Sequence, residues 1–176
     1  MPRKPPRALL QRIRLVVLDV DGTMTDGRLY YGAQGEAFKA FDVRDGHGLR
    51  LLSTHGGVKL AALTGRRADL VVQRCKELSI DHVVGQSRAK GAAIEKICAE
   101  LGVPPADTAF MGDDVNDLPA LRKVALSCAP ADAAQEVLRE VAWVSRRPAG
   151  RGAVRELCEV LLDAKVGWPP PDPEAP

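Results

Sequence analysis

Aromatic side chains are scarce in this chain of 176 residues, which has two tryptophans, two tyrosines and three phenylalanines. Proteins that bind single-stranded nucleic acids stack the bases on aromatic rings, so the scarcity argues against that function. An excess of positive charge is also missing, because 25 Lys and Arg face 23 Asp and Glu and leave a net charge of +2. Such a balance does not predict a surface for a phosphate backbone. We therefore expect no nucleic-acid partner.

The chain also lacks long apolar runs and paired cysteines. No stretch approaches the length of a membrane span, and residues 1–7 are basic and proline-rich without the apolar segment of a signal peptide. The cysteines are far apart and form no Cys-x-x-Cys pair, which indicates small core residues in a reducing compartment rather than disulfides or zinc ligands. These four residues are Cys75, Cys98, Cys128 and Cys158. We expect a cytoplasmic protein with no membrane partner.

The composition is that of one ordinary globular domain, with 45% hydrophobic and 27% charged residues. We expect the domain to span residues 12–165. Residues 1–11 are expected to be a flexible N-terminus. Residues 166–176 are rich in proline and are expected to form a disordered tail.

Short β-branched segments alternate with amphipathic ones along the domain. Repeated strand–helix units with short connections predict an α/β fold, a Rossmann-like doubly wound parallel sheet with helices on both faces. The expected strands are residues 13–18, 58–63, 81–84, 108–111, 125–128 and 142–144. The expected helices are residues 67–78, 87–101 (with Ser87 as N-cap), 114–124, 132–139 and 153–162, and another that follows a polar loop at 42–48 and ends near residues 56–57. Residues 28–41 predict a β-hairpin with its turn at 32–35.

The motif Asp19-Val20-Asp21-Gly22-Thr23 follows the first expected strand. Ligands of open α/β sheets bind at the carboxyl ends of the strands, where these two carboxylates emerge. Gly22 permits a sharp turn that brings the backbone close to whatever the carboxylates hold. The alternative is an Asp-Gly turn with no chemistry, so the five residues alone do not decide.

Matching side chains occur at three further strand ends. The second strand is followed by Thr64-Gly65-Arg66, Lys90 lies in the first turn of the helix after the third, and the fourth is followed by Gly112-Asp113-Asp114-Val115-Asn116-Asp117. Each alone has an ordinary interpretation, such as a helix cap or a solvated lysine. Their coincidence at four successive strand ends favours a shared site.

Up to five carboxylates would converge in this crevice, and unpaired charge at that density is costly to bury. A divalent cation would offset the repulsion. The available ligands are oxygens, which favours Mg²⁺ over zinc. A metal beside a carboxylate, a lysine and a hydroxyl is a suitable arrangement for phosphoryl transfer.

These motifs resemble, in order and context, the four motifs of the haloacid dehalogenase superfamily over about residues 12–162. The resemblance implies that Asp19 is the nucleophile that becomes an aspartyl-phosphate and that Asp21 protonates the leaving alcohol and later activates water. It implies that Thr64 and Lys90 bind phosphate. The implied Mg²⁺ ligands are Asp19, the backbone carbonyl of Asp21, and Asp113, with Asp114 and Asp117 in a supporting role.

The intervals between the motifs leave no room for a separate cap domain, so the hairpin is the minimal cap. Further motifs are similar to those of the 3-deoxy-D-manno-octulosonate 8-phosphate (KDO 8-phosphate) phosphatase family: residues 39–48, Thr64-Gly65-Arg66, Arg74 and residues 150–156. That family hydrolyses KDO 8-phosphate to KDO and phosphate in lipopolysaccharide sugar synthesis. The substrate-binding residues implied are Asp21, Asp42, Val43, Arg44, Asp45, Gly46, Arg50, Arg66, Arg74 and Lys90.

The resemblance also implies a homotetramer with sites shared between subunits, in which the hairpins pack together. The basic segment 146–152 would be flexible and would lie over a ligand. We place Arg66 at the mouth of the site and Lys39 on the hairpin. The chain departs from the family pattern at Asp42, where asparagine is expected, at Ala149, which replaces a glycine, and at His47, often aromatic.

Alternative functions remain open at this point. One is a phosphatase for a nine-carbon sugar-acid phosphate or another small phosphate ester. The intact Val43-Arg44-Asp45-Gly46 and Arg66 favour the eight-carbon substrate. A less favoured alternative is a non-enzymatic receiver-like module, but a pure phospho-acceptor has no need of a second acid at Asp21.

Overall fold

Strand β1 (Leu15–Leu18) lies inside a parallel sheet of six strands in the computed structural model, which describes residues 5–80 and 82–171. The strand order is β5-β4-β1-β6-β7-β8, and every neighbouring pair is parallel. The other strands of this sheet are β4 (Lys59–Leu63), β5 (His82–Val84), β6 (Thr108–Met111), β7 (Leu126–Ala129) and β8 (Trp143–Val144). The predicted α/β fold is thus confirmed.

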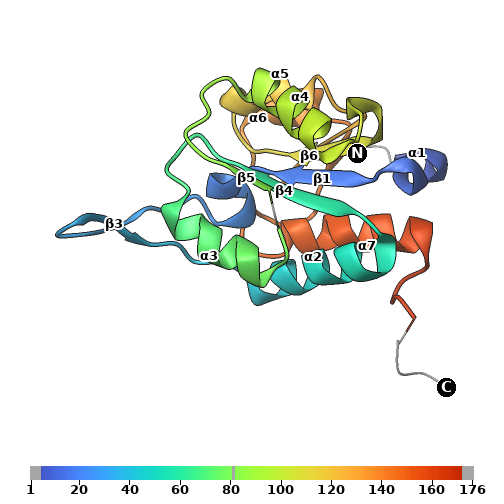
Figure 1. The fold of residues 1–176 in the computed structure, drawn as a ribbon, viewed down its shortest axis with the longest axis horizontal. Helices are drawn as coiled ribbons and strands as arrows, with labels where there is room; N and C mark the ends of the chain where they lie inside the picture. Colours follow the sequence, from blue (N-terminus) through green and yellow to red (C-terminus); the bar gives the residue numbers. More distant parts are fainter. Residues whose placement is uncertain (1–4, 81, 172–176) are drawn as a thin grey trace.

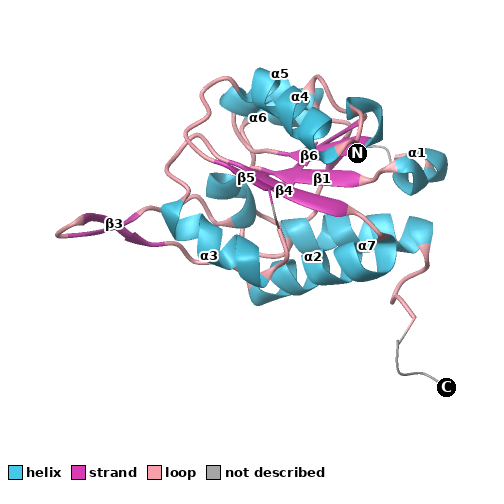
Figure 2. Cartoon of the chain, in the orientation of Figure 1, coloured by secondary structure: helices cyan, strands magenta, loops and turns pink. Residues whose placement is uncertain are grey.

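Helices cover both faces of this sheet (Figure 2). One layer contains α4 (Lys90–Leu101), α5 (Leu118–Leu121) and α6 (Gln135–Glu140), and the other contains α2 (Val43–Gly56), α3 (Asp69–Glu77) and α7 (Ala153–Lys165). Helix α1 (Arg7–Arg12) precedes β1, and three short turns complete the chain: η1 (Val20–Met24), η2 (Pro105–Asp107) and η3 (Val115–Asp117). None of the described helices is long and apolar enough to cross a membrane.

The alternation of side chains along β1 produces two separate cores. Val16 and Leu18 face the α2/α7 layer, whereas Leu15 and Val17 face the α4/α5/α6 layer, and all four are fully buried. A strand that is buried on both faces must be apolar at every position, which explains the continuous apolar run in the sequence. This leaves the carboxyl ends of the strands as the place for polar groups.

The predicted hairpin is formed by β2 (Tyr30–Gly32) and β3 (Gly35–Phe38), which extend away from the body of the molecule (Figure 1). Tyr30 stacks on Phe38 with the ring centroids 4.6 Å apart. Tyr31 and Phe38 nevertheless remain 68% and 55% exposed. The hairpin therefore carries an apolar surface that residues 5–80 and 82–171 do not cover.

Both ends of the described chain differ from the sequence-based expectation. Residues 7–12 form α1, which packs on α7 and buries Leu10, rather than continuing a flexible segment. Trp168 packs against the α7 side of the core, and the Arg155 guanidinium lies 4.9 Å from the centre of its ring. The expected tail therefore includes at least one packed side chain, while residues 1–4, residues 172–176 and the expected strand residue 81 lie outside the described part.

Several predicted helix boundaries are also wrong. Helix α2 begins at Val43, so most of the expected polar loop is helical, and Asp42 caps it by accepting a hydrogen bond from Arg44 N at 2.6 Å. Helix α4 begins at Lys90 rather than Ser87, with no side-chain cap. The helix expected over 114–124 consists of η3 and α5 and ends at Leu121.

Candidate active site

The turn after β1 depends on Gly22, whose φ of +96° favours glycine. A Cβ atom added there would lie 2.1 Å from Asp113 Oδ2, so the close approach of these two segments requires a glycine as well. The turn is held by Thr25, whose hydroxyl accepts from Gly22 N at 3.4 Å and donates to Val20 O at 3.3 Å. The motif after β1 thus brings its backbone against the motif after β6.

Lys90, at the start of α4, lies between two carboxylates that come from different strand ends. Its Nζ is 2.5 Å from Asp19 Oδ1 and 2.5 Å from Asp117 Oδ1. All three side chains are buried, with exposures of 6% or less. Burying a lysine and two carboxylates together is tolerable because each charge faces an opposite one.

Asp113 completes the cluster. Oxygen atoms of Asp19, Asp113 and Asp117 lie within 4.8 Å of one another, and Thr23 Oγ1 donates to Asp113 Oδ1 at 3.3 Å. Asp117 is already engaged through its second oxygen, which accepts from Asp113 N at 3.0 Å and Asp114 N at 3.2 Å. The all-oxygen donor set fits a hard divalent cation, and the engagement of Asp117 suits a supporting role.

The charge within the cluster is not balanced by Lys90 alone. Burial, with repulsion from Asp117, raises the pKa of Asp19 to about 8 in spite of Lys90. The same causes raise the pKa of Asp113 to about 7. Three carboxylates and one ammonium leave an excess of negative charge, which a bound cation would neutralise.

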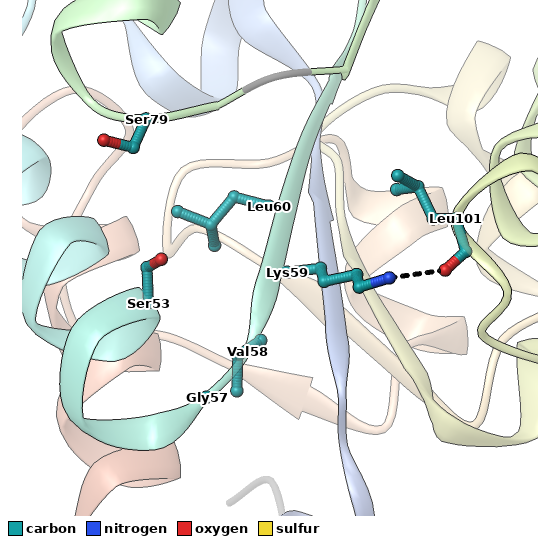
Figure 3. Close-up of a pocket in the computed structure, with 7 residues that line it drawn as sticks. All are labelled: Ser53, Gly57, Val58, Lys59, Leu60, Ser79 and Leu101. Carbon is teal, nitrogen blue, oxygen red and sulfur yellow. Dashed lines mark hydrogen bonds between the residues drawn. The ribbon is translucent and has the colours of Figure 1, made fainter.

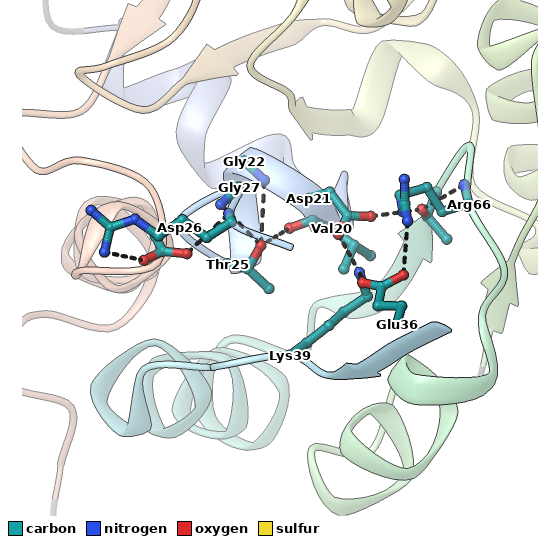
Figure 4. A network of polar contacts seen from close by, with 11 residues as sticks. Val20, Asp21, Gly22, Thr25, Asp26, Gly27, Glu36, Lys39 and Arg66 are labelled. Atoms are coloured by element: carbon teal, nitrogen blue, oxygen red, sulfur yellow. Dashed lines mark hydrogen bonds and ion pairs between the residues drawn. The ribbon is translucent and has the colours of Figure 1, made fainter. Parts of the chain in front are cut away.

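Asp21 and Arg66 belong to a second network at the base of the hairpin (Figure 4). Lys39 Nζ pairs with Asp21 Oδ1 and with Glu36 Oε1 at 2.5 Å, and Arg66 Nη2 donates to Glu36 Oε2 at 2.9 Å. Thr64 Oγ1 donates to Asp21 Oδ2 at 3.3 Å. Lys39, which was expected on the hairpin, lies directly after β3, and this strand brings it back to Asp21. The family-like segment 39–48 was its only signal.

The remaining predicted substrate-binding residues lie around the start of α2. Asp45 is buried and accepts from Arg155 N at 2.7 Å and Gly152 N at 3.3 Å, and burial raises its pKa to about 6. Arg74 fills the space over Gly46, where an added Cβ would lie 2.3 Å from its Nη2. Arg44 pairs with its neighbour Asp42 at 3.0 Å, and Val43 and Arg50 are exposed.

Within the described part of the chain, these α2 residues form no hydrogen bond or ion pair with the cluster around Asp19. Arg44 instead lines a cavity of about 220 Å³ together with arginines from the segment before α7. Its lining is Arg44, Arg146, Arg147, Arg151, Gly152, Arg155, Glu156 and Glu159. The structure thus divides the predicted site residues into a strand-end group and an α2 group.

The segment 146–152 is not a flexible flap as expected. Gly150 N donates to Thr23 O at 3.2 Å, Ala149 N donates to Asp132 Oδ1 at 2.8 Å, and Ala149 is buried. An added Cβ at Gly150 would lie 2.5 Å from Asp26 N, so the segment packs directly on the turn after β1. It supports the site from its own chain.

A cavity of about 410 Å³ at the opposite end of the sheet has none of this chemistry (Figure 3). It surrounds the start of β4, where Lys59 Nζ donates to the carbonyl of Leu101 at 2.8 Å. The amino ends of parallel strands are not where such folds bind ligands. The strand-end group is therefore the candidate active site.

Comparison with known proteins agrees with this geometry. The family model of haloacid dehalogenase-like hydrolases matches residues 60–157. The 3-deoxy-D-manno-octulosonate 8-phosphate phosphatase of Escherichia coli K12 is 43% identical over 158 residues, which cover 90% of this chain and 84% of that protein. The chain belongs to the haloacid dehalogenase-like hydrolases. The predicted enzyme class and family resemblance are confirmed.

Solved structures of this hydrolase family match over nearly the whole chain. The 3-deoxy-D-manno-octulosonate 8-phosphate phosphatase from Yersinia pestis has a TM-score of 0.87 and 43% identity, and the match covers 90% of this chain and 85% of that one. The enzyme of the same name from Moraxella catarrhalis, solved with a magnesium ion, a phosphate ion and a KDO molecule, has a TM-score of 0.86 and 34% identity, with 90% and 91% covered.

Proposed function

We propose that this hydrolase converts KDO 8-phosphate and water to KDO and inorganic phosphate, with Mg²⁺ as cofactor. The observation that carries the proposal is the strand-end group, in which Lys90 joins Asp19 to Asp117 beside Asp113. Support for the substrate comes from the names of the relatives and from the KDO molecule in the Moraxella catarrhalis structure. The product would serve lipopolysaccharide sugar synthesis.

In the proposed mechanism, Asp19 attacks phosphorus and forms an aspartyl-phosphate while the ester bond to the alcohol breaks. Asp21 gives a proton to the leaving oxygen and later takes one from the water that hydrolyses the aspartyl-phosphate. Thr64 and Lys90 hold phosphate oxygens. Lys90 suits this role because its ammonium is buried and already aimed at Asp19.

Mg²⁺ would be held by Asp19, the backbone carbonyl of Asp21, and Asp113, with Asp114 and Asp117 behind them. Asp114 and Asp117 support this assignment because together they form a reciprocal cap of η3, which fixes the loop that carries Asp113. The ion would supply neutralisation of phosphate charge in the transition state. The cluster has three carboxylates and one ammonium, and this excess of negative charge would attract the positively charged ion.

We further propose that the active form is a cytoplasmic homotetramer in which neighbouring subunits share the site. The exposed aromatic surface of the hairpin supports association, because exposed apolar patches mark interaction sites. The α2 group supports sharing, since Asp42, Val43, Arg44, Arg50 and Arg74 would otherwise lie apart from the phosphate they are proposed to serve.

The second candidate function is hydrolysis of a nine-carbon sugar-acid phosphate, because Asp42 stands where the pattern of the KDO 8-phosphate phosphatases has asparagine. The Asp42 carboxylate is hydrogen-bonded to Arg44. This contact lowers the pKa of Asp42 and keeps Asp42 charged beside any anionic substrate. A smaller neutral sugar phosphate would need neither Arg44 nor Arg66.

Phosphate release by the purified protein with Mg²⁺ tests the proposal across an eight-carbon sugar acid, a nine-carbon sugar acid and a neutral sugar phosphate. We expect the highest kcat/KM with KDO 8-phosphate and loss of activity on chelation. Asp19→Asn is nearly isosteric but cannot form the acyl-phosphate, so it should be inactive. Turnover of Asp19→Asn within about tenfold of the parent protein would contradict the mechanism.

A further inference from the structure

Lys39, on the segment that leaves the hairpin, brings a buried ammonium against Asp21. Its side chain is only 2% exposed, and its Nζ pairs with Asp21 Oδ1 and with Glu36 Oε1. Glu36 uses its other oxygen to accept from Arg66 Nη2 at 2.9 Å. Along these contacts, from Asp21 through Lys39 and Glu36 to Arg66, negative and positive charges alternate, and Figure 4 shows the four side chains gathered together.

Stability of the hairpin does not account for this arrangement. Lysine is almost never fully buried unless it is paired, because its ammonium loses strong hydration. An exposed lysine on a hairpin would avoid that cost. Other lysines of this protein form ion pairs at the surface, such as Lys96 with Glu100 at 3.7 Å, and keep the ammonium in water. The burial of Lys39 therefore suggests a task at the carboxylate that it contacts.

The two oxygens of Asp21 have different partners. Oδ1 is paired with Lys39, whereas Oδ2 accepts from Thr64 Oγ1 at 3.3 Å. Contacts on both oxygens fix the rotation of the carboxylate about its last bond. Because Thr64 is proposed to hold the phosphate, Oδ2 is the oxygen that faces the transferred group.

We infer that Lys39 is a positioning residue. It occupies Oδ1 of Asp21, so that only Oδ2 exchanges protons during the reaction, and Glu36 holds the Lys39 ammonium in that place. The inference rests on the proposed phosphatase function and deepens it. As Asp19 bonds to phosphorus and the ester bond breaks, the leaving oxygen takes a proton from Oδ2. The attacking water then gives one proton to the same Oδ2, which restores Asp21 and yields alcohol and phosphate.

A series of phosphate esters with different leaving groups tests this inference. An alkyl or phenyl oxygen needs a proton as it leaves, whereas 4-nitrophenolate leaves without one. In Lys39→Met, we expect first-turnover release of the alcohol from phenyl phosphate and an alkyl phosphate to slow by about 100-fold, within the range of general acid catalysis. Release of 4-nitrophenol should slow by less than about fivefold, and KM should stay within about threefold.

Two matched variants accompany Lys39→Met. Lys39→Arg keeps a cation within reach of Asp21 and should recover at least about a tenth of the rate lost with the alkyl ester. Lys96→Met removes a lysine whose side chain is 76% exposed and should leave all rates unchanged. Thermal unfolding of each variant identifies any loss of fold.

The possible results separate the inference from the function on which it rests. Equal slowing for every leaving group, or a raised KM with kcat intact, would overturn the positioning role, because the first indicates general distortion and the second direct substrate binding. A parent protein that hydrolyses the aryl esters but not KDO 8-phosphate would overturn the proposed substrate while the leaving-group comparison still decides on Lys39. A parent protein that hydrolyses no ester would overturn both.

Discussion

Gly22 is required both by its backbone conformation and by its close approach to Asp113 in the candidate active site. Its φ of +96° strains any other residue, and a Cβ there would lie 2.1 Å from Asp113 Oδ2. We expect Gly22→Ala to lower the free energy of unfolding by more than about 2 kcal/mol and to lower kcat by displacing Asp113, since a positive φ alone costs about 1–2 kcal/mol.

Gly57→Ala is the matched control for this change. Gly57 also has a positive φ, +61°, but an added Cβ would have no neighbour within 4 Å. It should show the conformational cost in urea unfolding and keep full activity. Equal loss of kcat in the two variants would show that contact with Asp113 is not what Gly22 protects.

At the same scale, the residues at the four strand ends could be predicted from sequence, but Lys39 could not. The strand ends are predictable because parallel strands bring their carboxyl ends to one edge whatever the details of packing. Lys39 depends on how the hairpin leaves and re-enters the domain, which is a matter of tertiary packing. No periodicity in residues 28–41 specifies that its ammonium returns to Asp21.

Helices α2 and α7 are coupled by one buried carboxylate. Asp45, inside α2, accepts hydrogen bonds from Gly152 N and Arg155 N at the start of α7, and burial raises its pKa to about 6. The folded state therefore holds a proton on Asp45 more tightly than the unfolded chain does. Its contribution to stability is complete below pH about 4 and is lost as the pH rises through about 6.

We expect this contribution to amount to a fall on the order of 3 kcal/mol in the free energy of unfolding between pH 4 and pH 7. Urea titrations at several pH values, with saturating Mg²⁺ to keep the metal-site carboxylates ionised, measure it. Asp45→Asn should flatten the profile, whereas Asp69→Asn, which removes a carboxylate that is 66% exposed, should not. An unchanged slope in Asp45→Asn would assign the effect to other groups.

At several helix boundaries, tertiary packing overrides the local sequence signals that predict where a helix begins or ends. Ser87 has the chemistry of an N-cap, yet α4 begins at Lys90, whose ammonium must reach Asp19 and Asp117. Residues 7–12 and Trp168 lie near the ends of the sequence and carry no local signal for packing. In the folded protein they pack against the apolar surface formed with α7, which exists only once the sheet is assembled.

At the scale of the whole molecule, the excess charge at the strand ends couples metal binding to stability. The raised pKa values of Asp19, about 8, and Asp113, about 7, mean that protons compete with a cation for the folded protein. Mg²⁺ should therefore raise the melting temperature more at pH 8 than at pH 6, because a ligand that binds only the folded state stabilises it more the tighter it binds at a given concentration. Asp113→Asn should abolish the increase at both pH values. An increase that is larger at pH 6 would contradict this account.

The last prediction concerns the division between the strand-end group and the α2 group. Truncation before segment 146–152 cannot test sharing of sites, since it would remove α7, with Leu157, Leu161 and Leu162 buried in the core. A point variant can, because Arg44 is 72% exposed and pairs only with a neighbouring residue in its own chain segment among the described contacts. We expect Arg44→Ala to assemble normally but to bind substrate more weakly, by about 1.5–3 kcal/mol for one charge-assisted contact.

If Arg44 serves a neighbouring subunit, Arg44→Ala and Asp19→Asn should complement each other. Refolding them together creates sites with Asp19 from one chain and Arg44 from the other, which should restore a fraction of the activity at low substrate concentration. Light scattering checks that mixed oligomers form. As a control, Phe38→Asp adds charge to the exposed face of the hairpin and should prevent both assembly and complementation while the melting temperature stays high. Mixed oligomers without recovered activity would place Arg44 at the site of its own chain, and an active monomer would remove the reason for sharing.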